Sequence, residues 1–381
     1  MPSQQASQGT AAPRTAARPA GRVFNFSPGP AMLPDEIMAR VQEEFLNYAG
    51  LGASVIEISH RSKQIVAITE EAAALFRELV RLPENYSVLF MHGGGRMQFS
   101  AVPLNLIART GARKAAYVET GVFSATAIKD AAPYGKIETV ASSRSEKFVR
   151  VPEFTRESLA PDTSYLHITT NNTAYGTRWN KFPETGEIPL VGDSTSEILS
   201  RVVDYSRFGI VYAGLQKNLG PSGTSIVVVR KDLMQYAMPE TPPLLSYAVV
   251  EKGKSLVNTP STFNIYFALQ VMRWIKELGG VVEMERRNNE KATLLYDLLD
   301  SSSYYRPLAD PAHRSTMNVT FDLPTPQATE SFIAEASQQG LYALKGYREV
   351  GGIRASIYNG MPQAGVEALV SFMKEFERKQ G

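Results

Sequence analysis

The sequence predicts an α/β protein with a mostly parallel central sheet flanked by helices and a smaller C-terminal α/β domain. From about Met38 to Lys276, helical patterns alternate with short apolar runs, which is typical of parallel strands joined by helical crossovers. A long amphipathic pattern over Val281–Leu298 then predicts a bridging helix. Further strand and helix patterns follow this bridge and predict the smaller domain.

The predicted strands are short, apolar and bounded by glycine, proline or polar residues, as buried strands are. In the larger part they are Ser87–Met91, Ala115–Val118, Tyr165–Ile168, Ile188–Gly192, Gly209–Ala213 and Thr224–Arg230. In the smaller part we expect strands near Asn318–Phe321 and Ile353–Ile357, and helices at Ala328–Gln339 and Gln363–Lys379. These elements predict a large domain over residues 23–276 and a small domain over residues 277–381.

Residues 1–22 differ in composition from the rest of the chain. They are rich in Ala, Ser, Gln, Pro and Arg, and they contain no acidic residue and no apolar core, so they do not form a secretory signal. The arginines also suit an organellar transit peptide, but Pro13 and Pro19 oppose the amphipathic helix that such a peptide forms. We therefore expect a disordered tail and a cytoplasmic protein.

The composition of the whole chain excludes several functional classes. The net charge of +2 gives no sign of a nucleic-acid partner. The absence of cysteine excludes disulfides, thiolate metal sites and cysteine nucleophiles. The four histidines lack the spacing of metal ligands, so we expect no metal. No apolar run approaches the about 20 residues that span a bilayer, so we expect no membrane association.

Lys217 lies on a short turn of small residues between two predicted strands, Gly209–Ala213 and Thr224–Arg230. Partial burial in such a turn disfavours the charged amine and lowers its pKa, which makes it a usable nucleophile. A lysine that forms a Schiff base with a carbonyl cofactor has this requirement. From spacing alone, a surface lysine on a hairpin explains the pattern equally well.

Asp193 follows the apolar run Ile188–Gly192, at the carboxyl end of a predicted strand, where open α/β sheets bind ligands. The pyridinium nitrogen of pyridoxal 5′-phosphate (PLP) pairs with a carboxylate in such a position. Taken alone, however, Asp193 is better explained as the N-cap of a helix that starts near Glu197.

Three glycines, Gly93 to Gly95, follow the predicted strand Ser87–Met91 and precede a helix start. Backbone N–H groups converge in such a turn, and the helix N-terminus adds partial positive charge, so the segment has the form of a phosphate cradle. It is neither a Walker A motif nor a G-x-G-x-x-G fingerprint. A glycine turn required only for packing is the alternative.

Together, these elements give a specific resemblance over about Phe24 to Phe376. The chain resembles the phosphoserine aminotransferases, a class V family of PLP-dependent enzymes with the aminotransferase fold type I. The resemblance rests on several short segments, namely Phe26–Pro30, Ile58–Ser62, His92–Arg96, Asn172–Thr173, the Asp193 segment, Gln216–Asn218, Asn258–Pro260 and Leu344–Asn359. It implies a homodimer with shared active sites and PLP as the cofactor.

The resemblance also implies a role for each matching residue. Lys217 is the catalytic lysine that binds PLP covalently, and Asp193 holds its ring nitrogen. Phe123 stacks on the ring, Thr173 contacts its phenolic oxygen, and Gly95, Arg96 and Gln216 bind its phosphate. Asn258 and Thr259 reach that phosphate from the neighbouring subunit. The anionic groups of the substrates are received by a basic set, namely His60, Arg61, Arg96, Arg348 and Arg354.

The activity that the resemblance implies is reversible ping-pong amino transfer from L-glutamate to 3-phosphohydroxypyruvate. The products are O-phospho-L-serine and 2-oxoglutarate, which places the enzyme in serine biosynthesis and, in some organisms, also in pyridoxine biosynthesis. Arginine suits such substrates because its planar fork of donors binds carboxylate and phosphate alike.

Two residues depart from the family pattern. Phe123 stands where the family usually has a tryptophan, so its stacking area is smaller and the N–H donor is missing. Tyr347 stands where the family usually has a histidine, and it cannot carry a positive charge. Tyr347 therefore favours the alternative of a related aminotransferase with a different 2-oxo acid. A catalytically silent PLP-binding protein is a further alternative, which the intact Lys217, Asp193 and arginine set oppose.

Overall fold

The computed structural model describes residues 21–380. Almost all of the N-terminal segment 1–22, for which we predict a tail, lies outside the described residues. No helix among residues 21–380 combines the length and the apolar character that crossing a membrane requires. The described residues also contain no cluster of His, Cys, Asp or Glu that could hold a metal ion.

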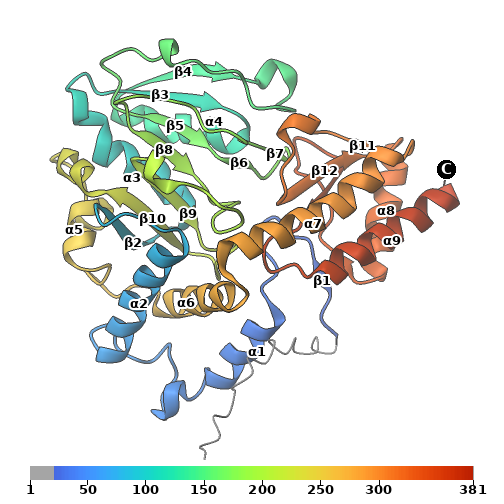
Figure 1. Ribbon diagram of the computed structural model, residues 1–381, viewed down its shortest axis with the longest axis horizontal. Helices are drawn as coiled ribbons and strands as arrows, with labels where there is room; N and C mark the ends of the chain where they lie inside the picture. The colour runs from blue at the N-terminus through green and yellow to red at the C-terminus, as the bar shows by residue number, and fades with distance from the viewer. Residues whose placement is uncertain (1–20, 381) are drawn as a thin grey trace, which may run out of the picture.

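The centre of the molecule is a seven-stranded sheet with the order β2-β10-β9-β8-β5-β3-β4 (Figure 1). Its strands are β2 (Tyr86–His92), β3 (Lys114–Glu119), β4 (Lys136–Ser142), β5 (Leu166–Thr169), β8 (Leu190–Asp193), β9 (Ile210–Gly214) and β10 (Thr224–Arg230). Neighbouring strands from β4 to β9 pair in parallel, whereas β10 runs antiparallel to both β9 and β2. The predicted mostly parallel sheet is confirmed.

Helices cover both faces of this sheet. Successive strand residues point to opposite faces, and apolar residues on both faces are buried by these helices. In β10, Ile226 and Val228 pack with α2 (Lys63–Leu79) and α6 (Thr262–Glu277). The alternate residues Val227 and Val229 pack with α3 (Gly94–Leu106), α4 (Val122–Ala131) and α5 (Tyr247–Lys252). A further helix, α1 (Asp35–Glu44), lies against α6. Both faces of the strands are therefore buried, which explains their continuous apolar sequences.

The smaller part of the chain contains a three-stranded antiparallel sheet with the order β11-β12-β14. Its strands are β11 (Arg306–Pro307), β12 (Asn318–Asp322) and β14 (Ile353–Ser356), and its helices are α7 (Gly280–Ser301), α8 (Pro326–Gln338) and α9 (Gln363–Gln380). Two short pairs complete the fold, β1 (Phe24–Asn25) with β13 (Leu341–Tyr342), and β6 (Asn171–Asn172) with β7 (Thr177–Arg178).

The long helix α7 contributes to two separate apolar cores. Val281 and Met284 in its first turns pack into the core of the larger part. Ala292 and Leu295, further along, pack with β12, β14, α8 and α9. We propose that these cores belong to the two predicted domains, 23–276 and 277–381, and that α7 joins them.

The helix expected near Glu197, which would have made Asp193 an N-cap, is not present. The residues after Asp193 form turns instead. Leu199 adopts φ 55°, a left-handed conformation that cannot continue a right-handed α-helix and that leucine rarely adopts. The N-cap interpretation of Asp193 is therefore wrong.

The apolar core of the smaller part gives a test of stability. Phe332 is fully buried and contacts the rings of Phe321, Phe372 and Phe376. Because Phe332→Ala leaves a cavity among these rings, we expect it to lower the free energy of unfolding by about 3–5 kcal/mol. Urea unfolding followed by circular dichroism measures the change. Val282→Ala on the exposed face of α7 is the control and should change little, and an equal loss in both variants would contradict the assignment of this core.

Candidate active site

A cavity of about 450 Å³ lies at the carboxyl ends of β5 and β8. The structure brings many of the predicted site residues together around it, namely Gly95, Arg96, Phe123, Thr173, Asp193, Gln216, Lys217 and Arg354. These residues come from both parts of the chain, because Arg354 lies on β14 and the others lie in the larger part.

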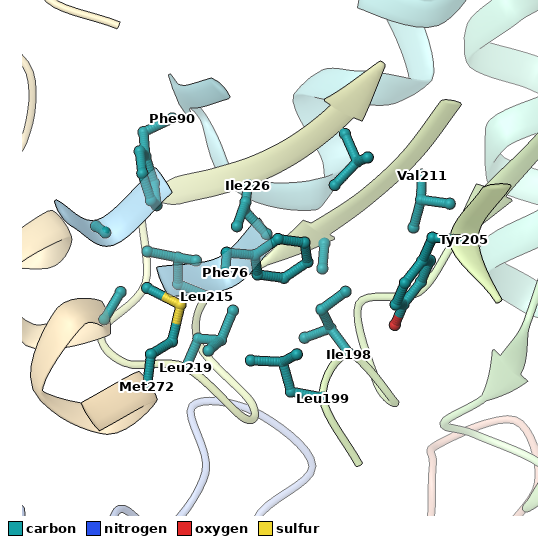
Figure 2. Packing of buried hydrophobic residues seen from close by; sticks show 14 of the residues in the cluster. Phe76, Phe90, Ile198, Leu199, Tyr205, Val211, Leu215, Leu219, Ile226 and Met272 are labelled. Carbon is teal, nitrogen blue, oxygen red and sulfur yellow. The ribbon is translucent and has the colours of Figure 1, made fainter. Parts of the chain in front are cut away.

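Lys217 lies on the turn that joins β9 to the antiparallel strand β10. The turn is anchored by Leu215 and Leu219, which are fully buried in the core next to Phe76 and Met272 (Figure 2). Although β9 and β10 pair as in a hairpin, the lysine is only 7% exposed. The interpretation as a surface lysine is therefore wrong.

The N-terminal motif helps to bury this lysine. Gly29 lies against the aliphatic stem of Lys217, and a Cβ atom at this glycine would be 3.2 Å from Cγ of the lysine. The backbone N–H of Ala31 donates to the carbonyl of Gln216 at 2.9 Å. The N-terminal segment thus packs directly against the lysine turn.

The amine of Lys217 donates to Oγ1 of Thr173 at 2.6 Å. Burial lowers the pKa of Lys217 to about 7, although the charge of Asp193 acts in the opposite direction. Arg354 lowers this pKa further. A large fraction of the amine is therefore neutral near pH 7, and a neutral amine is a nucleophile and a base.

Asp193 ends β8 and faces the same cavity, with one carboxylate oxygen accepting from the backbone N–H of Thr195 at 3.0 Å. Burial raises its pKa, whereas hydrogen bonds from Thr195 and the charge of Lys217 lower it. A buried carboxylate without an ion-pair partner among the described residues fits the protonated ring nitrogen of PLP, which would supply the counter-charge.

The glycine turn before α3 has the geometry of an anion cradle. Gly93 and Gly94 adopt φ 87° and 64°, and the helix then begins at Gly94. A Cβ atom at Gly95 would lie 2.6 Å from Oγ1 of Thr195, so the close approach of these segments requires glycine. The side-chain oxygen of Gln216 is buried without a hydrogen-bond partner among the described residues. If the amide is turned over, it offers N–H donors to the cavity, and a phosphate fits this set.

Aromatic and cationic side chains also line the cavity. The ring of Phe123 lies 5.5 Å from Nζ of Lys217, and its centroid lies 6.4 Å from that of Tyr347. The guanidinium of Arg354 lies 6.0 Å from the Tyr347 ring. Arg354 is buried, its Nε has no partner among the described residues, and burial lowers its pKa. A buried guanidinium with a free donor is suited to bind an anionic ligand.

The remaining predicted residues do not line this cavity. His60 and Arg61 lie on the turn before α2, where Nε2 of His60 is buried without a partner and Arg61 is exposed. Asn258 and Thr259 lie between α5 and α6, and Oδ1 of Asn258 is 3.2 Å from Nε2 of His92. Arg348 is exposed and lines a neighbouring groove.

The side chain of Arg96 also has a different environment from the one expected for a substrate ligand. Its side chain is 71% exposed and its guanidinium pairs with Asp130 at 3.1 Å, although Arg96 is among the residues that line the cavity. The phosphate-binding role predicted for its backbone N–H requires no contribution from this guanidinium.

Two further residues of the cavity were missed by the sequence analysis. Thr195 both donates to Asp193 and accepts from the backbone N–H of Gly214 at 3.2 Å. Thr169 lies on β5 and pairs in register with Asp193 on β8. The hydroxyl of Thr169 is buried without a partner among the described residues. The position of Thr169 directly after a predicted strand was the available signal, because parallel strands end at a common edge.

Comparison with known proteins identifies the family. The aminotransferase class-V family model matches residues 23–369. The chain belongs to this family. It is 46% identical over 356 residues to a phosphoserine aminotransferase of Bacillus cereus, covering 93% of this chain and 98% of the relative. It is 47% identical over 364 residues to that of Syntrophobacter fumaroxidans, covering 95% and 100%.

Solved structures agree with these relatives. The phosphoserine aminotransferase from Bacillus circulans subsp. alkalophilus superposes with a TM-score of 0.92 at 42% identity, covering 95% of this chain and 100% of that one. The predicted fold and family are confirmed. The protein is therefore a PLP-dependent transaminase, and the residues around the cavity fit that cofactor.

The depressed pKa of Lys217 predicts an unusual reactivity. In protein freed of cofactor, we expect acylation of Lys217 to reach half of its maximal rate near pH 7, because only the neutral amine attacks. Peptide mass spectrometry after brief labelling at a series of pH values measures this rate. The exposed Lys254 is the internal reference, since Glu70 raises its pKa and its labelling should rise only at much higher pH. Parallel pH curves for both lysines would contradict the prediction.

Proposed function

We propose that the protein transfers the amino group of L-glutamate to 3-phosphohydroxypyruvate, giving O-phospho-L-serine and 2-oxoglutarate. The observation that carries this proposal is the buried Lys217 amine, placed between Thr173, Asp193 and the unpaired guanidinium of Arg354. The relatives named phosphoserine aminotransferase support the choice of substrate. This reaction belongs to serine biosynthesis, and we also propose pyridoxine biosynthesis as a further use and the cytoplasm as its location.

The residues of the cavity divide the chemistry among them. When bound, PLP supplies an electron sink for the bonds at the substrate Cα. Lys217 would hold the cofactor and, once its amine is free, would act as the general base that takes the proton from the substrate Cα and delivers it to C4′ of the cofactor. The carboxylate of Asp193 keeps the ring nitrogen protonated, and Thr173 orients the lysine amine through their hydrogen bond.

The substrate is oriented by its charges. We propose that Arg354 binds the α-carboxylate, because it is the buried cation of the cavity and has a free donor. The phenol of Tyr347 lies beside it and offers a neutral hydrogen bond. His60, Arg61 and Arg348 remain the proposed partners of the distal phosphate or carboxylate, although in one chain none of them lines the cavity.

A second copy of the chain completes this arrangement in our proposal. Asn258, Thr259, His60 and Arg61 lie outside the cavity of their own chain, so they are available to the cavity of a partner. The segment before His60 also exposes large apolar side chains, with Leu46 at 78% and Ile56 at 53% exposure. Apolar exposure of this kind marks protein interfaces. We therefore propose a homodimer with shared active sites.

The substrate assignment is tested by a half-reaction on protein loaded with PLP. We expect L-phosphoserine and L-glutamate to bleach the visible band of the bound cofactor, because each carries a second anionic group. L-Serine and L-alanine lack this group and should leave the band unchanged. The Lys217→Ala variant should retain PLP but lose turnover by at least about 1,000-fold, since it lacks the base.

Each other outcome is informative. Bleaching by glutamate without phosphoserine would show that Tyr347 marks a different oxo acid and would overturn the substrate assignment. Turnover near the wild-type level in Lys217→Ala would overturn the assignment of the base.

Mixed dimers test the shared active sites. One chain carries Lys217→Ala, and the other carries Asn258→Ala together with Thr259→Ala. In a mixed dimer, the site that retains Lys217 receives the intact Asn258 and Thr259 of its partner, so activity should return when two weak preparations are refolded together. Activity is measured at limiting PLP, and separately refolded samples mixed afterwards are the control. No gain after joint refolding would contradict the sharing of sites.

A further inference from the structure

The three residues Ile198, Leu199 and Ser200 form a buried turn soon after Asp193, and each of their carbonyls accepts a hydrogen bond from a different asparagine. Asn218 donates to Ile198 at 3.0 Å, Asn359 donates to Leu199 at 3.0 Å, and Asn288 donates to Ser200 at 2.9 Å. All three asparagines are buried, with exposed fractions between 1% and 5%.

The three asparagines are also joined to one another. The amide of Asn288 donates to Oδ1 of Asn359 at 2.8 Å, and the backbone N–H of Asn359 donates to Oδ1 of Asn218 at 3.1 Å. We call Asn218, Asn288 and Asn359 the asparagine bridge. Its members come from three distant parts of the chain, namely the turn of Lys217, helix α7 and the segment after β14.

The local backbone explains why this bridge is needed. Leu199 has φ 55°, so the turn cannot satisfy its carbonyls through helical hydrogen bonds. The side chains of Ile198 and Leu199 lie in the apolar core beside Leu219 (Figure 2), which excludes water from this side. The short amides of Asn218 and Asn359 both donate and accept here, whereas Asn288 donates twice and its Oδ1 has no partner among the described residues. A strained, buried turn of this kind persists only where its surroundings hold it in place.

Two members of the bridge, and the turn that all three hold, lie close in sequence to functional groups of the cavity. Asn218 is next to Lys217, the bridged carbonyls follow soon after Asp193, and Asn359 follows the strand that carries Arg354. The bridge therefore connects the backbone segments that supply the base, the ring carboxylate and the proposed substrate guanidinium. Asn288 also connects this network to helix α7, the helix that we propose joins the two domains.

We propose that Asn218, Asn288 and Asn359 are positioning residues for amino transfer, which hold the segments of Asp193, Lys217 and Arg354 in one fixed arrangement. The proposal rests on the proposed function for its reaction. Orientation of this quality matters because catalytic groups lose most of their effect when they are displaced by about 1 Å. None of the three side chains lines the cavity, so they act through their neighbours.

The test uses Asn288→Ala in the PLP-loaded protein, because Asn288 is the member of the bridge that is most remote in sequence from the cavity residues. We expect kcat of the phosphoserine half-reaction to fall by about 10-fold or more, with a smaller change in KM. We also expect the visible circular dichroism of the bound cofactor to change and PLP to dissociate faster after dilution. These last two readouts do not depend on which amino acid is the substrate.

Asn105→Ala is the matched control. Asn105 is equally buried, and its amide, like that of Asn288, donates two hydrogen bonds, here to the backbone carbonyls of Ala101 and Leu245 at 2.8 and 2.7 Å. It lies in α3 outside the cavity lining. Its loss should lower the melting temperature to a similar extent, with kcat, dichroism and PLP release unchanged. If both variants lose only stability, the asparagine bridge is structural and the proposal is overturned.

Asn288→Ser is the second variant if Asn288→Ala does not fold. Its hydroxyl can donate to only one of the two acceptors, so the same changes should appear with smaller size, and their absence in a folded Asn288→Ser protein would overturn the proposal. A wild-type protein that does not react with phosphoserine would refute the proposed function alone. The dichroism and the PLP release rate would still decide the role of the bridge.

Discussion

The burial of the Lys217 amine is the constraint on which the rest of the site depends. A lysine is charged in water, and the cost of removing that charge from water lowers the pKa of this residue to about 7. The surroundings must therefore bury the amine without a carboxylate in direct contact, because a tight ion pair would favour the charged amine and raise its pKa. They do so with a hydroxyl, Thr173, in direct contact, while the carboxylate of Asp193 acts only through its charge. The result is an amine that is reactive at neutral pH.

The central sheet supplies the means of placing these groups together. Thr169, Asp193 and Tyr212 occupy matching positions on β5, β8 and β9. Since parallel strands end at a common edge, a carboxylate at the end of β8 is carried to the same edge as the residues of its neighbours. Strand β10 reverses direction after the Lys217 turn, so that turn also lies at this edge. The apolar faces of the strands, covered by helices on both sides, keep the edge rigid.

Small residues and buried amides then join segments that the sheet alone does not connect. Glycine at positions 29 and 95 lets the chain entry and the start of α3 approach Lys217 and Thr195 closely. The smaller part of the chain contributes Arg354 and Tyr347, and its contacts with the larger part include hydrogen bonds from Asn171 to Asn318 and from Tyr358 to Pro28. The cavity is thus lined by residues from both parts of the chain, and polar contacts between the two parts hold them together.

The sequence by itself determined the alternation of strands and helices, the strand-end position of Asp193 and the glycine turn before α3, because these are local patterns of apolar spacing and backbone freedom. It left open whether Lys217 was exposed and whether Asp193 capped a helix, since both depend on distant neighbours. Only the tertiary structure decided these points, through Leu215, Leu219 and Gly29 around the lysine and through the left-handed Leu199 after the aspartate. The unpaired hydroxyl of Thr169 and the hydrogen bonds of Asn288 and Asn359 could not be predicted either, because hydrogen bonds between remote side chains leave no periodic signal in a sequence.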